Sequence, residues 1–536
     1  MRALMAFLDE APDSQLTVIP GQPVEPGRYQ RVAVVLQDRI DLRELELPKG
    51  VRTAALAVWR TDGSSALSLT PRPEWPALEL IRSRKVDDGW LTVLRFASPA
   101  PVHAVVRELA RQSVWPDRVG DRGLVVGHSQ NNKVPADVII ADWHLTWDEA
   151  DHPVTGRGPY VVTERDGPMR LGPLDERVLN PTGFDPTADG PEVALATIDP
   201  VRERVVRSLR SARGVVADGS IRAAESNAAQ IARLALAGVP VTTPELMPEV
   251  RHLLGDAVAD AIVAPVDLTD ALAREEHSIV LRRAALNEFS SFAWRRKLGE
   301  LAGVRVHWQP SVSVVMATRR PELIEHAIGQ VARQRGVGSI ELVLAPHGWD
   351  ADAAQIRDLA GPGVEVEVVP CAEDVMFGDV LQAAAERADG DVVVKMDDDD
   401  WYAPDFVADL LLARAYSGAE VVGTPDDYYY LESRDLTARL GQPSEVFRQF
   451  VAGGTLLVEG QLLREVGGFR SVHRHVDAQL LHAVRRSGGA IYRTHGLGYC
   501  LRRATVGHTW DTDLDHLEKR AAASWPGFRP SRLMEV

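Results

Sequence analysis

Four consecutive acidic residues, Asp397 to Asp400, are the clearest chemical feature of this sequence. They directly follow residues 392–396, a mostly apolar run that is typical of a buried strand. Four carboxylates at one strand end repel each other, so a divalent cation is the simplest partner. Alternate residues of an extended strand point to the same side, so we expect Asp397 and Asp399 to face one ion. Their oxygens suit Mg²⁺ or Mn²⁺ shared with a diphosphate. A solvated acidic turn is the alternative.

The elements that must position these acids alternate between strands and helices. We predict strands at 312–317, 340–345, 364–369 and 392–396, and helices that begin at Arg320 and span 380–388. This order predicts right-handed βαβ units and a doubly wound sheet. Such sheets bind ligands at the carboxyl ends of their strands, which is where the acidic run lies.

Three stretches between residues 308 and 510 resemble family 2 glycosyltransferases with the GT-A fold. They read VSVVMATRRPELIEHAIGQVARQRG, GDVLQAAAERADGDVVVKMDDDDWYAPDFV and GGTLLVEGQLLREVGGF, in the family's order. The family's Asp-X-Asp motif is matched by Asp397, Asp399, Asp400, Trp401, Tyr402 and Pro404. The resemblance implies that Asp399 binds the metal and that Asp397 binds the metal or the ribose of a nucleotide sugar. A register shifted to Asp398 and Asp400 is the alternative.

The same resemblance implies a donor site around the strand ends. Its expected members are Thr318, Arg319, Arg320, Asp350, Gly378, Asp397, Asp398, Arg502 and Arg503. The turn at 318–320 wraps the nucleotide in the family, and arginines there can offset the diphosphate charge; a solvated basic turn is the alternative. Residues 346–350 read Pro-His-Gly-Trp-Asp where the family has Asp-Asp-Gly-Ser, which puts the base-recognition contact in doubt.

Sugar transfer with inversion needs a base opposite the leaving diphosphate. The family supplies an acidic residue soon after Gly-Gly-Phe, and the resemblance assigns this role to Asp477, although Val476 replaces the usual Glu. An N-capping Asp without chemistry is the alternative. The resemblance also implies an acceptor loop at Gly453, Gly454 and Thr455, an acceptor contact at Trp401, and His508 as a third metal ligand.

Composition restricts the function classes. The chain has 536 residues, a net charge of −16 and 45% hydrophobic residues, so it is ordinary in composition and repels nucleic acid at long range. Two cysteines exclude a disulfide framework. The N-terminus is a poor signal peptide, and no apolar run is long enough to span a bilayer, so we expect a cytoplasmic protein. Contact with the inner face of a membrane and oligomerisation stay open. The amino-acid composition is poor in Lys and rich in Ala and Arg, which suggests a high-GC bacterium.

We expect an α/β chain whose C-terminal doubly wound mixed sheet follows a Rossmann-like α/β domain and a smaller N-terminal α/β or β-rich domain. The predicted parts are 1–150, a connection at 151–192, 193–305, a GT-A domain at 306–510, and a helical tail at 511–536. RLALAGVPVTTPE and REEHSIVLRRAAL resemble the C-terminal half of GT-B glycosyltransferases, with Glu245 as candidate ribose ligand. A degenerate relic, an active second site and no relation all remain open there.

The sequence thus favours an inverting, metal-dependent glycosyltransferase. Its expected cofactor is Mn²⁺ or Mg²⁺. Its expected donor is a nucleotide sugar, with a UDP-sugar as the first candidate, and its expected acceptor is a glycan or a lipid-linked cell-envelope carbohydrate. The alternatives are a metal-dependent nucleotidyltransferase and a non-catalytic glycan-binding or scaffold protein with a vestigial site.

Overall fold

The computed structural model describes residues 2–20, 22–36, 45, 47–48, 50–61, 75–86, 89–112, 126–128, 138–140, 160–162, 167–171, 173–174, 176, 190–198, 203–209, 212–217, 223–301, 310–487, 489–503 and 514–536. Packing divides the chain into two compact units. The first comprises Met1–Gly120, Gly418–Glu420 and His482–Ala490, and the second comprises Asp121–Ser417, Val421–Leu481 and Ile491–Val536. Each unit is described by itself.

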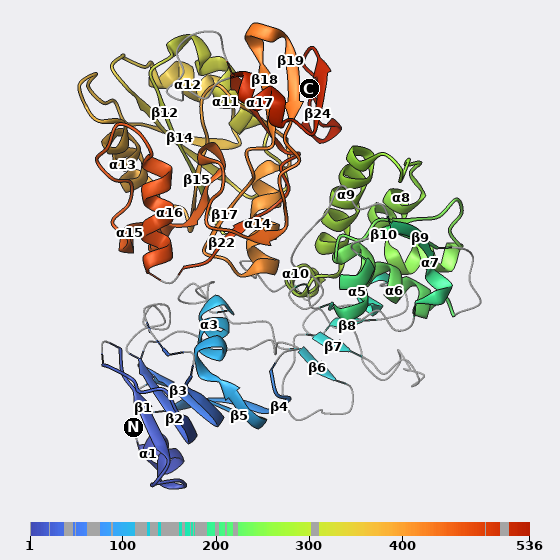
Figure 1. Ribbon diagram of the computed structural model, residues 1–536, viewed down its shortest axis with the longest axis vertical. Coiled ribbons are helices and arrows are strands. Elements are labelled where there is room, and N and C mark those ends of the chain that lie inside the picture. Colours follow the sequence, from blue (N-terminus) through green and yellow to red (C-terminus); the bar gives the residue numbers. More distant parts are fainter. Residues whose placement is uncertain are drawn as a thin grey trace. The chain divides into compact units, whose positions relative to one another are not determined.

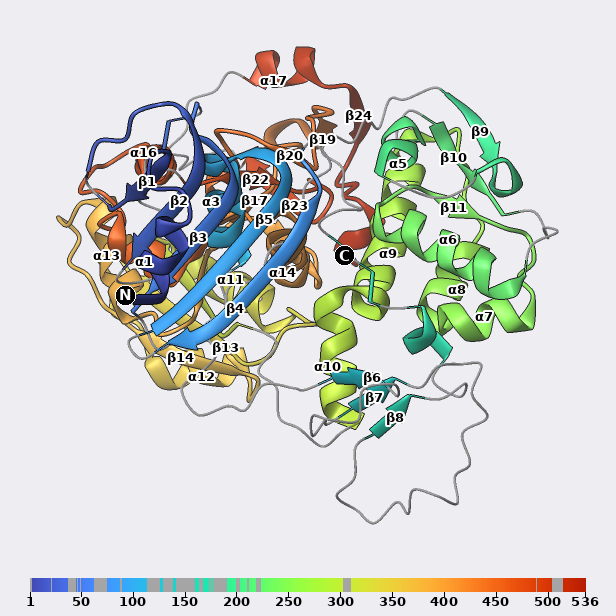
Figure 2. The ribbon, with the colours of Figure 1, turned by 90° about the horizontal axis from the view of Figure 1, so that it is seen from below.

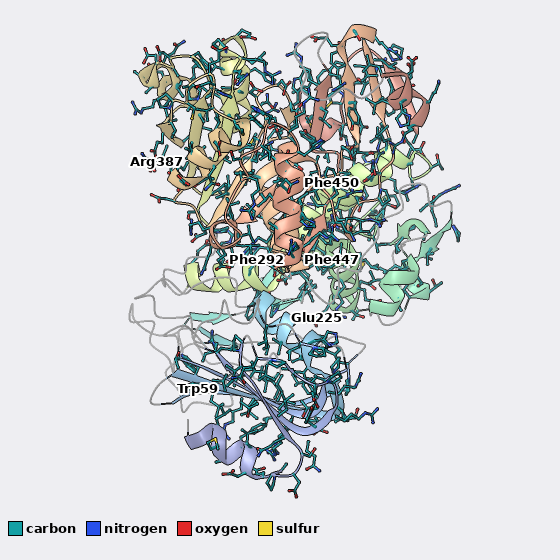
Figure 3. All side chains as sticks on the ribbon, turned by 60° about the vertical axis from the view of Figure 1, so that its left-hand side comes forward. Trp59, Glu225, Phe292, Arg387, Phe447 and Phe450 are labelled. Atoms are coloured by element: carbon teal, nitrogen blue, oxygen red, sulfur yellow. The ribbon has the colours of Figure 1, made fainter. Side chains whose placement is uncertain are left out.

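The first unit is built on a five-stranded mixed sheet of order β1-β2-β3-β5-β4, whose strands lie side by side in Figure 2. Its elements are α1 (Arg2–Asp9), β1 (Gln15–Val18), β2 (Arg28–Leu36), β3 (Arg52–Arg60), β4 (Leu78–Val86), β5 (Gly89–Pro101) and α3 (Val102–Gln112). One core joins α1 to Trp59, which Figure 3 labels, and another joins the sheet to α3. The apolar runs 32–36, 54–58 and 91–94 predict strands from the sequence, and they lie in β2, β3 and β5.

The second unit begins with two small parallel sheets, of order β6-β7-β8 and β11-β10-β9. Its first elements are β6 (Val126–His128), β7 (Val138–Ile140), β8 (Tyr160–Val162), η1 (Gly167–Arg170), β9 (Gly190–Ala194), η2 (Leu195–Thr197), α5 (Glu203–Leu209), β10 (Ala212–Val216), α6 (Ala224–Leu236) and β11 (Val241–Thr242). The helix α6 ends just before Gly238, which adopts a positive φ of 75°.

Helices dominate the stretch that follows. They are α7 (Pro248–Leu254), α8 (Asp256–Val263), α9 (Ala271–Phe289) and α10 (Ser291–Leu301). The Asp270 carboxylate caps α9 by accepting the N–H groups of Leu272 and Ala273. The sequence spacing over 274–301 predicts a long helical stretch, and the structure confirms it except at Ser290, which is extended, with φ −60° and ψ 157°, and separates α9 from α10.

The rest of the chain contains an eight-stranded mixed sheet of order β14-β13-β12-β15-β21-β17-β22-β20. Its first half comprises β12 (Val312–Thr318), η3 (Pro321–Leu323), α11 (Ile324–Ala332), β13 (Ile340–Pro346), α12 (Ala353–Ala360), β14 (Val364–Val368), α13 (Phe377–Arg387) and β15 (Val392–Lys395). These four strands are parallel, as expected, and β12, β13 and β15 are Val- and Leu-rich because both faces of such a sheet are covered.

The second half adds antiparallel pairing, with β21 between β15 and β17. Its elements are α14 (Phe406–Ser417), β17 (Val421–Gly423), β20 (Val446–Phe447), η5 (Gly453–Thr455), β21 (Leu457–Glu459), α15 (Gly460–Glu465), α16 (Val476–Arg486) and β22 (Ile491–Arg493). The edge strand β20 runs toward η5, and Phe447 and Phe450, both labelled in Figure 3, are exposed there.

A second sheet, of order β16-β23-β18-β19-β24, begins at Trp401, directly after the acidic run. Figure 1 shows its strands β18, β19 and β24 together. The sheet consists of β16 (Trp401–Tyr402), β18 (Tyr428–Leu431), η4 (Glu432–Arg434), β19 (Leu436–Arg439), β23 (Tyr499–Arg503) and β24 (Ala523–Pro526), with α17 (Leu514–Arg520) and η6 (Arg532–Met534) nearby in sequence. The expected helical tail at 511–536 is therefore wrong beyond α17, because Ala523 to Trp525 pair with β19.

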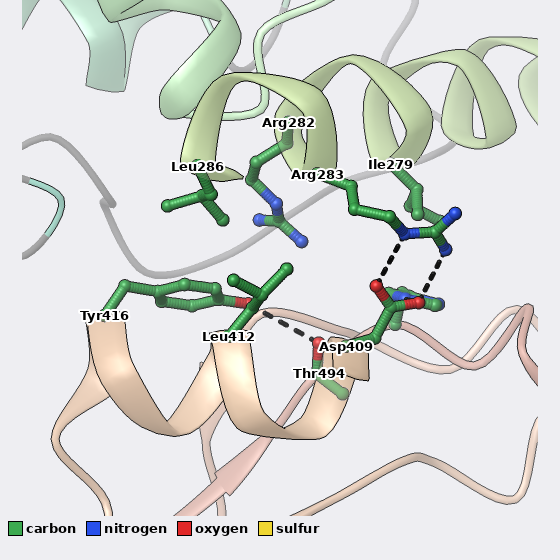
Figure 4. Close-up of a pocket in the computed structure, with 9 residues that line it drawn as sticks. Ile279, Arg282, Arg283, Leu286, Asp409, Leu412, Tyr416 and Thr494 are labelled. Atoms are coloured by element: carbon green, nitrogen blue, oxygen red, sulfur yellow. Dashed lines mark hydrogen bonds and ion pairs between the residues drawn. The ribbon is translucent and has the colours of Figure 1, made fainter. Parts of the chain in front are cut away.

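Buried ion pairs join α9 to the elements around the large sheet. Arg283 pairs with Asp409 and Asp405, each at 2.7 Å, and Arg282 pairs with Glu445. Figure 4 shows Arg283 against Asp409, and Tyr416 beside Thr494. Within the described residues, no helix is both long and apolar enough to cross a membrane. Both cysteines, Cys371 and Cys500, are free thiols.

Candidate functional site

The candidate site forms where the parallel strands β12, β13 and β15 end. In the sheet register Thr318 lies opposite Pro346, and Val315 lies opposite Lys395, the last residue of β15. The chain then leaves the large sheet through Asp397–Asp400 and enters the small sheet at Trp401. The acidic run is therefore fixed at both of its ends by hydrogen-bonded strands.

Asp398 and Asp399 are held by the basic turn that follows β12. The Arg320 guanidinium donates to Asp399 at 2.7 Å and to both oxygens of Asp398, and the Thr318 hydroxyl also donates to Asp398. Burial raises the pKa of Asp398, and Arg320 opposes this rise. The structure thus brings Thr318 and Arg320 together with Asp398 and Asp399, and the expected roles of these residues stay predictions.

Asp400 points instead into the small sheet. Its carboxylate accepts the Tyr499 hydroxyl at 2.6 Å and the backbone N–H of Arg502 at 2.9 Å. Burial raises the pKa of Asp400 well above its ordinary value, and the charges of Asp399 and Asp397 raise it further. This enclosed carboxyl fits a role in joining the two sheets.

Asp397 faces a group that the sequence reasoning missed, the ammonium of Lys395. The side chain of Lys395 is 3% exposed, and its Nζ lies 2.6 Å from Asp397 Oδ1 and 3.1 Å from the carbonyl oxygen of Gly453. The same Nζ lies 3.6 Å from Asp477 Oδ1. The only available signal was a lysine in an otherwise apolar strand two residues before an acid.

Asp477 lies in the first turn of α16, with its side chain 26% exposed. Burial raises the pKa of Asp477, Lys395 lowers it, and Asp397 raises it again. A Cβ on Gly453 would lie 2.1 Å from Asp477 Oδ2, and a Cβ on Gly454 would lie 2.7 Å from Asp397 Oδ2. The candidate base, the acidic motif and the expected acceptor loop therefore meet at one point.

The turn after β13 is tied to the end of β12. Arg319 donates to Nδ1 of His347 and to the carbonyl oxygen of Glu373, both at 2.9 Å, while the Trp349 indole N–H donates to the carbonyl oxygen of Thr318 at 2.9 Å. Burial and the neighbouring Arg319 lower the pKa of His347. Asp350 is exposed at the end of this turn. The missing family acids are thus replaced by an arginine–histidine contact.

Other predicted residues lie apart from this meeting point. Gly378 packs so tightly that a Cβ would lie 1.8 Å from the carbonyl oxygen of Arg470, in the loop that leads to α16. The Arg502 guanidinium pairs with Glu432 at 2.7 Å. Trp401 packs against His326 and Phe528.

The remaining predicted site residues are Thr455, Arg503 and His508. Thr455 is buried, and its hydroxyl donates to the carbonyl oxygen of Ala452 at 2.8 Å. Arg503 is also buried. His508, the expected third metal ligand, lies outside the described residues. Their expected roles stay predictions.

The acidic residues fit a divalent cation in their chemistry. Within the described part of the chain, Asp397 Oδ1 pairs with Lys395 and Asp399 Oδ2 pairs with Arg320, which leaves one oxygen of each carboxylate for another partner. Mg²⁺ sites commonly use one or two carboxylates and complete their shell with substrate phosphates and water. Among the described residues, no three His, Cys, Asp or Glu side chains gather as a ready metal site.

Part of the chain is similar to known proteins. Residues 312–481 match the model of the glycosyl transferase family 2. A mannosyltransferase of Pyrobaculum calidifontis, PcManGT, solved with GDP-Man and Mn²⁺, is 17% identical over 38% of this chain and 59% of its own, with a TM-score of 0.30. S. aureus TarS 1–349, solved with UDP-GlcNAc, is 14% identical over 39% of this chain and 64% of its own, with a TM-score of 0.31. The chain thus covers less than two thirds of either. A search of curated proteins gave no match.

Proposed function

Because residues 312–481 match the model of the glycosyl transferase family 2, we propose that this chain is an inverting, metal-dependent glycosyltransferase. The proposed donor is a nucleotide sugar, with a UDP-sugar as the first candidate. The proposed acceptor is a hydroxyl of a glycan or of a lipid-linked cell-envelope carbohydrate. One observation carries the proposal: Asp397 and Asp477 lie 2.6 and 3.6 Å from the same buried Lys395 ammonium. The acidic motif and a carboxylate suited to accept a proton are therefore adjacent.

In this proposal the chain's own residues divide the work. Asp477 accepts the proton of the acceptor hydroxyl while that oxygen bonds to the sugar carbon, opposite the departing diphosphate. Arg320 and Arg319, at the turn after β12, offset negative charge beside the donor. Asp397 and Asp399 would hold a divalent cation, whose chemistry is to neutralise the charge that develops on the leaving diphosphate.

Thermal shift with a panel of nucleotide sugars tests this proposal. A cognate donor with Mn²⁺ should raise the Tm, because a ligand at 100 times its Kd stabilises the fold by about 2.7 kcal/mol. EDTA should remove the shift. Asp399→Asn should lose it, whereas Asp358→Asn, on the exposed face of α12, should keep it.

The product released separates the alternatives. A glycosyltransferase releases a nucleoside diphosphate, and a nucleotidyltransferase releases pyrophosphate. If no nucleotide sugar shifts the Tm and none is consumed with Mn²⁺ present, the scaffold alternative replaces the proposal.

A further inference from the structure

Lys395 is a buried cation with an unusual set of partners. It ends the strand β15, whose other residues are three valines, and its side chain is 3% exposed. A buried ammonium is costly unless charges and hydrogen bonds compensate it. Here two carboxylates and one carbonyl oxygen do so, although a single well-placed carboxylate would balance the charge.

The three partners come from different parts of the candidate site. Asp397 belongs to the acidic motif, Gly453 belongs to the loop η5, and Asp477 belongs to the first turn of α16. The link to Asp397 is a short ion pair at 2.6 Å, whereas Asp477 lies at 3.6 Å. One side chain therefore joins the donor side of the site to the acceptor side.

The neighbouring glycines support this arrangement. Any side chain at position 453 would collide with Asp477 Oδ2, and any side chain at position 454 would crowd Asp397 Oδ2. The two glycines thus leave room for both carboxylates beside the same loop. Without the Lys395 ammonium, these two like-charged groups would repel each other.

We propose that Lys395 is a positioning residue of the transfer reaction, which ties the Asp477 base and the Gly453 loop to the donor-side Asp397. This inference rests on the proposed function. Lys395 acts through its partners, since its Nζ is enclosed by them. Its loss lets η5 and the start of α16 move away from the acidic motif, so the base no longer meets the acceptor hydroxyl in the correct geometry.

Kinetics of Lys395→Met and Lys395→Arg test the chemical part. Misplaced groups commonly cost about 100-fold in rate, so Lys395→Met should lower the kcat of transfer by about that factor while the donor KM changes less than about threefold. Lys395→Arg, which keeps the charge, should recover at least part of the loss. Lys395→Met combined with Asp477→Asn should be no slower than the slower single variant, because the two side chains act as a unit. Equal losses in kcat for both lysine variants, or additive losses in the double variant, would overturn the inference.

Hydrogen–deuterium exchange tests the physical tie without any substrate. In Lys395→Met, the peptides that cover 453–455 and 476–481 should exchange faster, while those of β12 and β13 should not change. Lys297→Met, which breaks the pair between Lys297 of α10 and Glu288 of α9, is the matched control and should leave all these peptides unchanged. Unchanged exchange at 453–455 and 476–481 overturns the tie. If the wild-type chain transfers no sugar, the proposed function fails, and the exchange result still decides whether Lys395 makes this tie.

Discussion

At the scale of single residues, the absence of two side chains matters as much as the presence of charged ones. Gly453 and Gly454 leave room for the carboxylates of Asp477 and Asp397, and a Cβ at either position would come within 2.7 Å of an acidic oxygen. Real Cβ contacts are not that close, so a substitution must displace the carboxylate or the loop. The geometry of the base is therefore sensitive to the smallest change in this loop.

Gly453→Ala should lower the kcat of transfer by about 10- to 100-fold, because the added methyl group displaces Asp477 from its place. The donor-induced rise in Tm should persist. Gly329→Ala is the matched control, since nothing lies within 4 Å of a Cβ there. Transfer by Gly453→Ala at the wild-type rate would show that Asp477 is not placed as the structure has it.

The sequence predicted the acids of this site but not the group that joins them. Asp397–Asp400 follow an apolar run, so their position at a strand end could be predicted from local pattern. Lys395 could not be assigned a role, because its partners Gly453 and Asp477 come from loops far along the chain. Only folding shows that one ammonium meets both of them.

At the scale of elements, the helix α9 is fixed by a buried carboxylate with four donors. Glu445 pairs with Arg282 and accepts the hydroxyls of Tyr416 at 2.7 Å, Tyr492 at 2.8 Å and Thr494 at 3.1 Å. The side chains of Arg282 and Glu445 are 7% and 3% exposed. The large sheet and the helical stretch before it thus share one charge network.

Glu445→Gln should lower the Tm by several degrees, because it leaves the Arg282 charge buried without a counter-ion. Breaking such a buried pair commonly costs about 3–5 kcal/mol. Glu300→Gln breaks the exposed pair with Arg296 and should leave the Tm unchanged, since exposed pairs contribute little. Equal Tm values for the two variants would contradict the importance of this network.

The same carboxylate predicts a pH dependence. Burial alone would raise the pKa of Glu445, but Arg282, the Tyr416 hydroxyl and His495 lower it from 4.5 to about 2. A lowered folded pKa stabilises the fold above pH 4.5, and this contribution is lost as the pH falls toward 2. The Tm difference between wild type and Glu445→Gln should therefore be largest near pH 7 and shrink between pH 4.5 and 3, as calorimetry at several pH values can check.

Most elements of the first half of the large sheet follow from local pattern, whereas the boundary between α9 and α10 does not. The strands β12, β13, β14 and β15 lie where apolar runs predicted them. The break between α9 and α10 at Ser290 was missed, because helical spacing continues across it and no Gly or Pro marks it. The helix α9 ends where the backbone of Ser290 becomes extended. The pattern of apolar and polar side chains does not record this change of backbone conformation.

At the scale of the whole chain, the net charge of −16 is no guide to the site, where Lys395 and Arg320 each pair with two acids. The small sheet also depends on the whole sequence. Trp401 pairs with Cys500, and Tyr428 pairs with the same residue from the other side. Pairings between such distant segments leave no local signal, which is why this sheet could not be predicted.

The segment that forms β24 and η6 should be required for stability. Trp525 stacks on Tyr428, Ser531 donates to Glu276 of α9 at 2.7 Å, and Arg333 donates to the carbonyl oxygen of Met534 at 2.7 Å. A chain that stops at Ala522 should therefore melt several degrees lower. Removal of Val536 alone, which is 62% exposed, is the control and should not change the Tm. An unchanged Tm in the longer truncation would mean that these contacts add no stability.

The shared ammonium also affects how such enzymes can be recombined. Anyone who exchanges the loop at 453–455 or the start of α16 for those of another protein that matches the same family model, in order to change the acceptor, also changes the surroundings of position 395. A chimera that inherits a new acceptor half without a matching residue at the end of β15 would have two acids facing each other with no cation between them. Position 395 and the acceptor half should therefore be exchanged as one module.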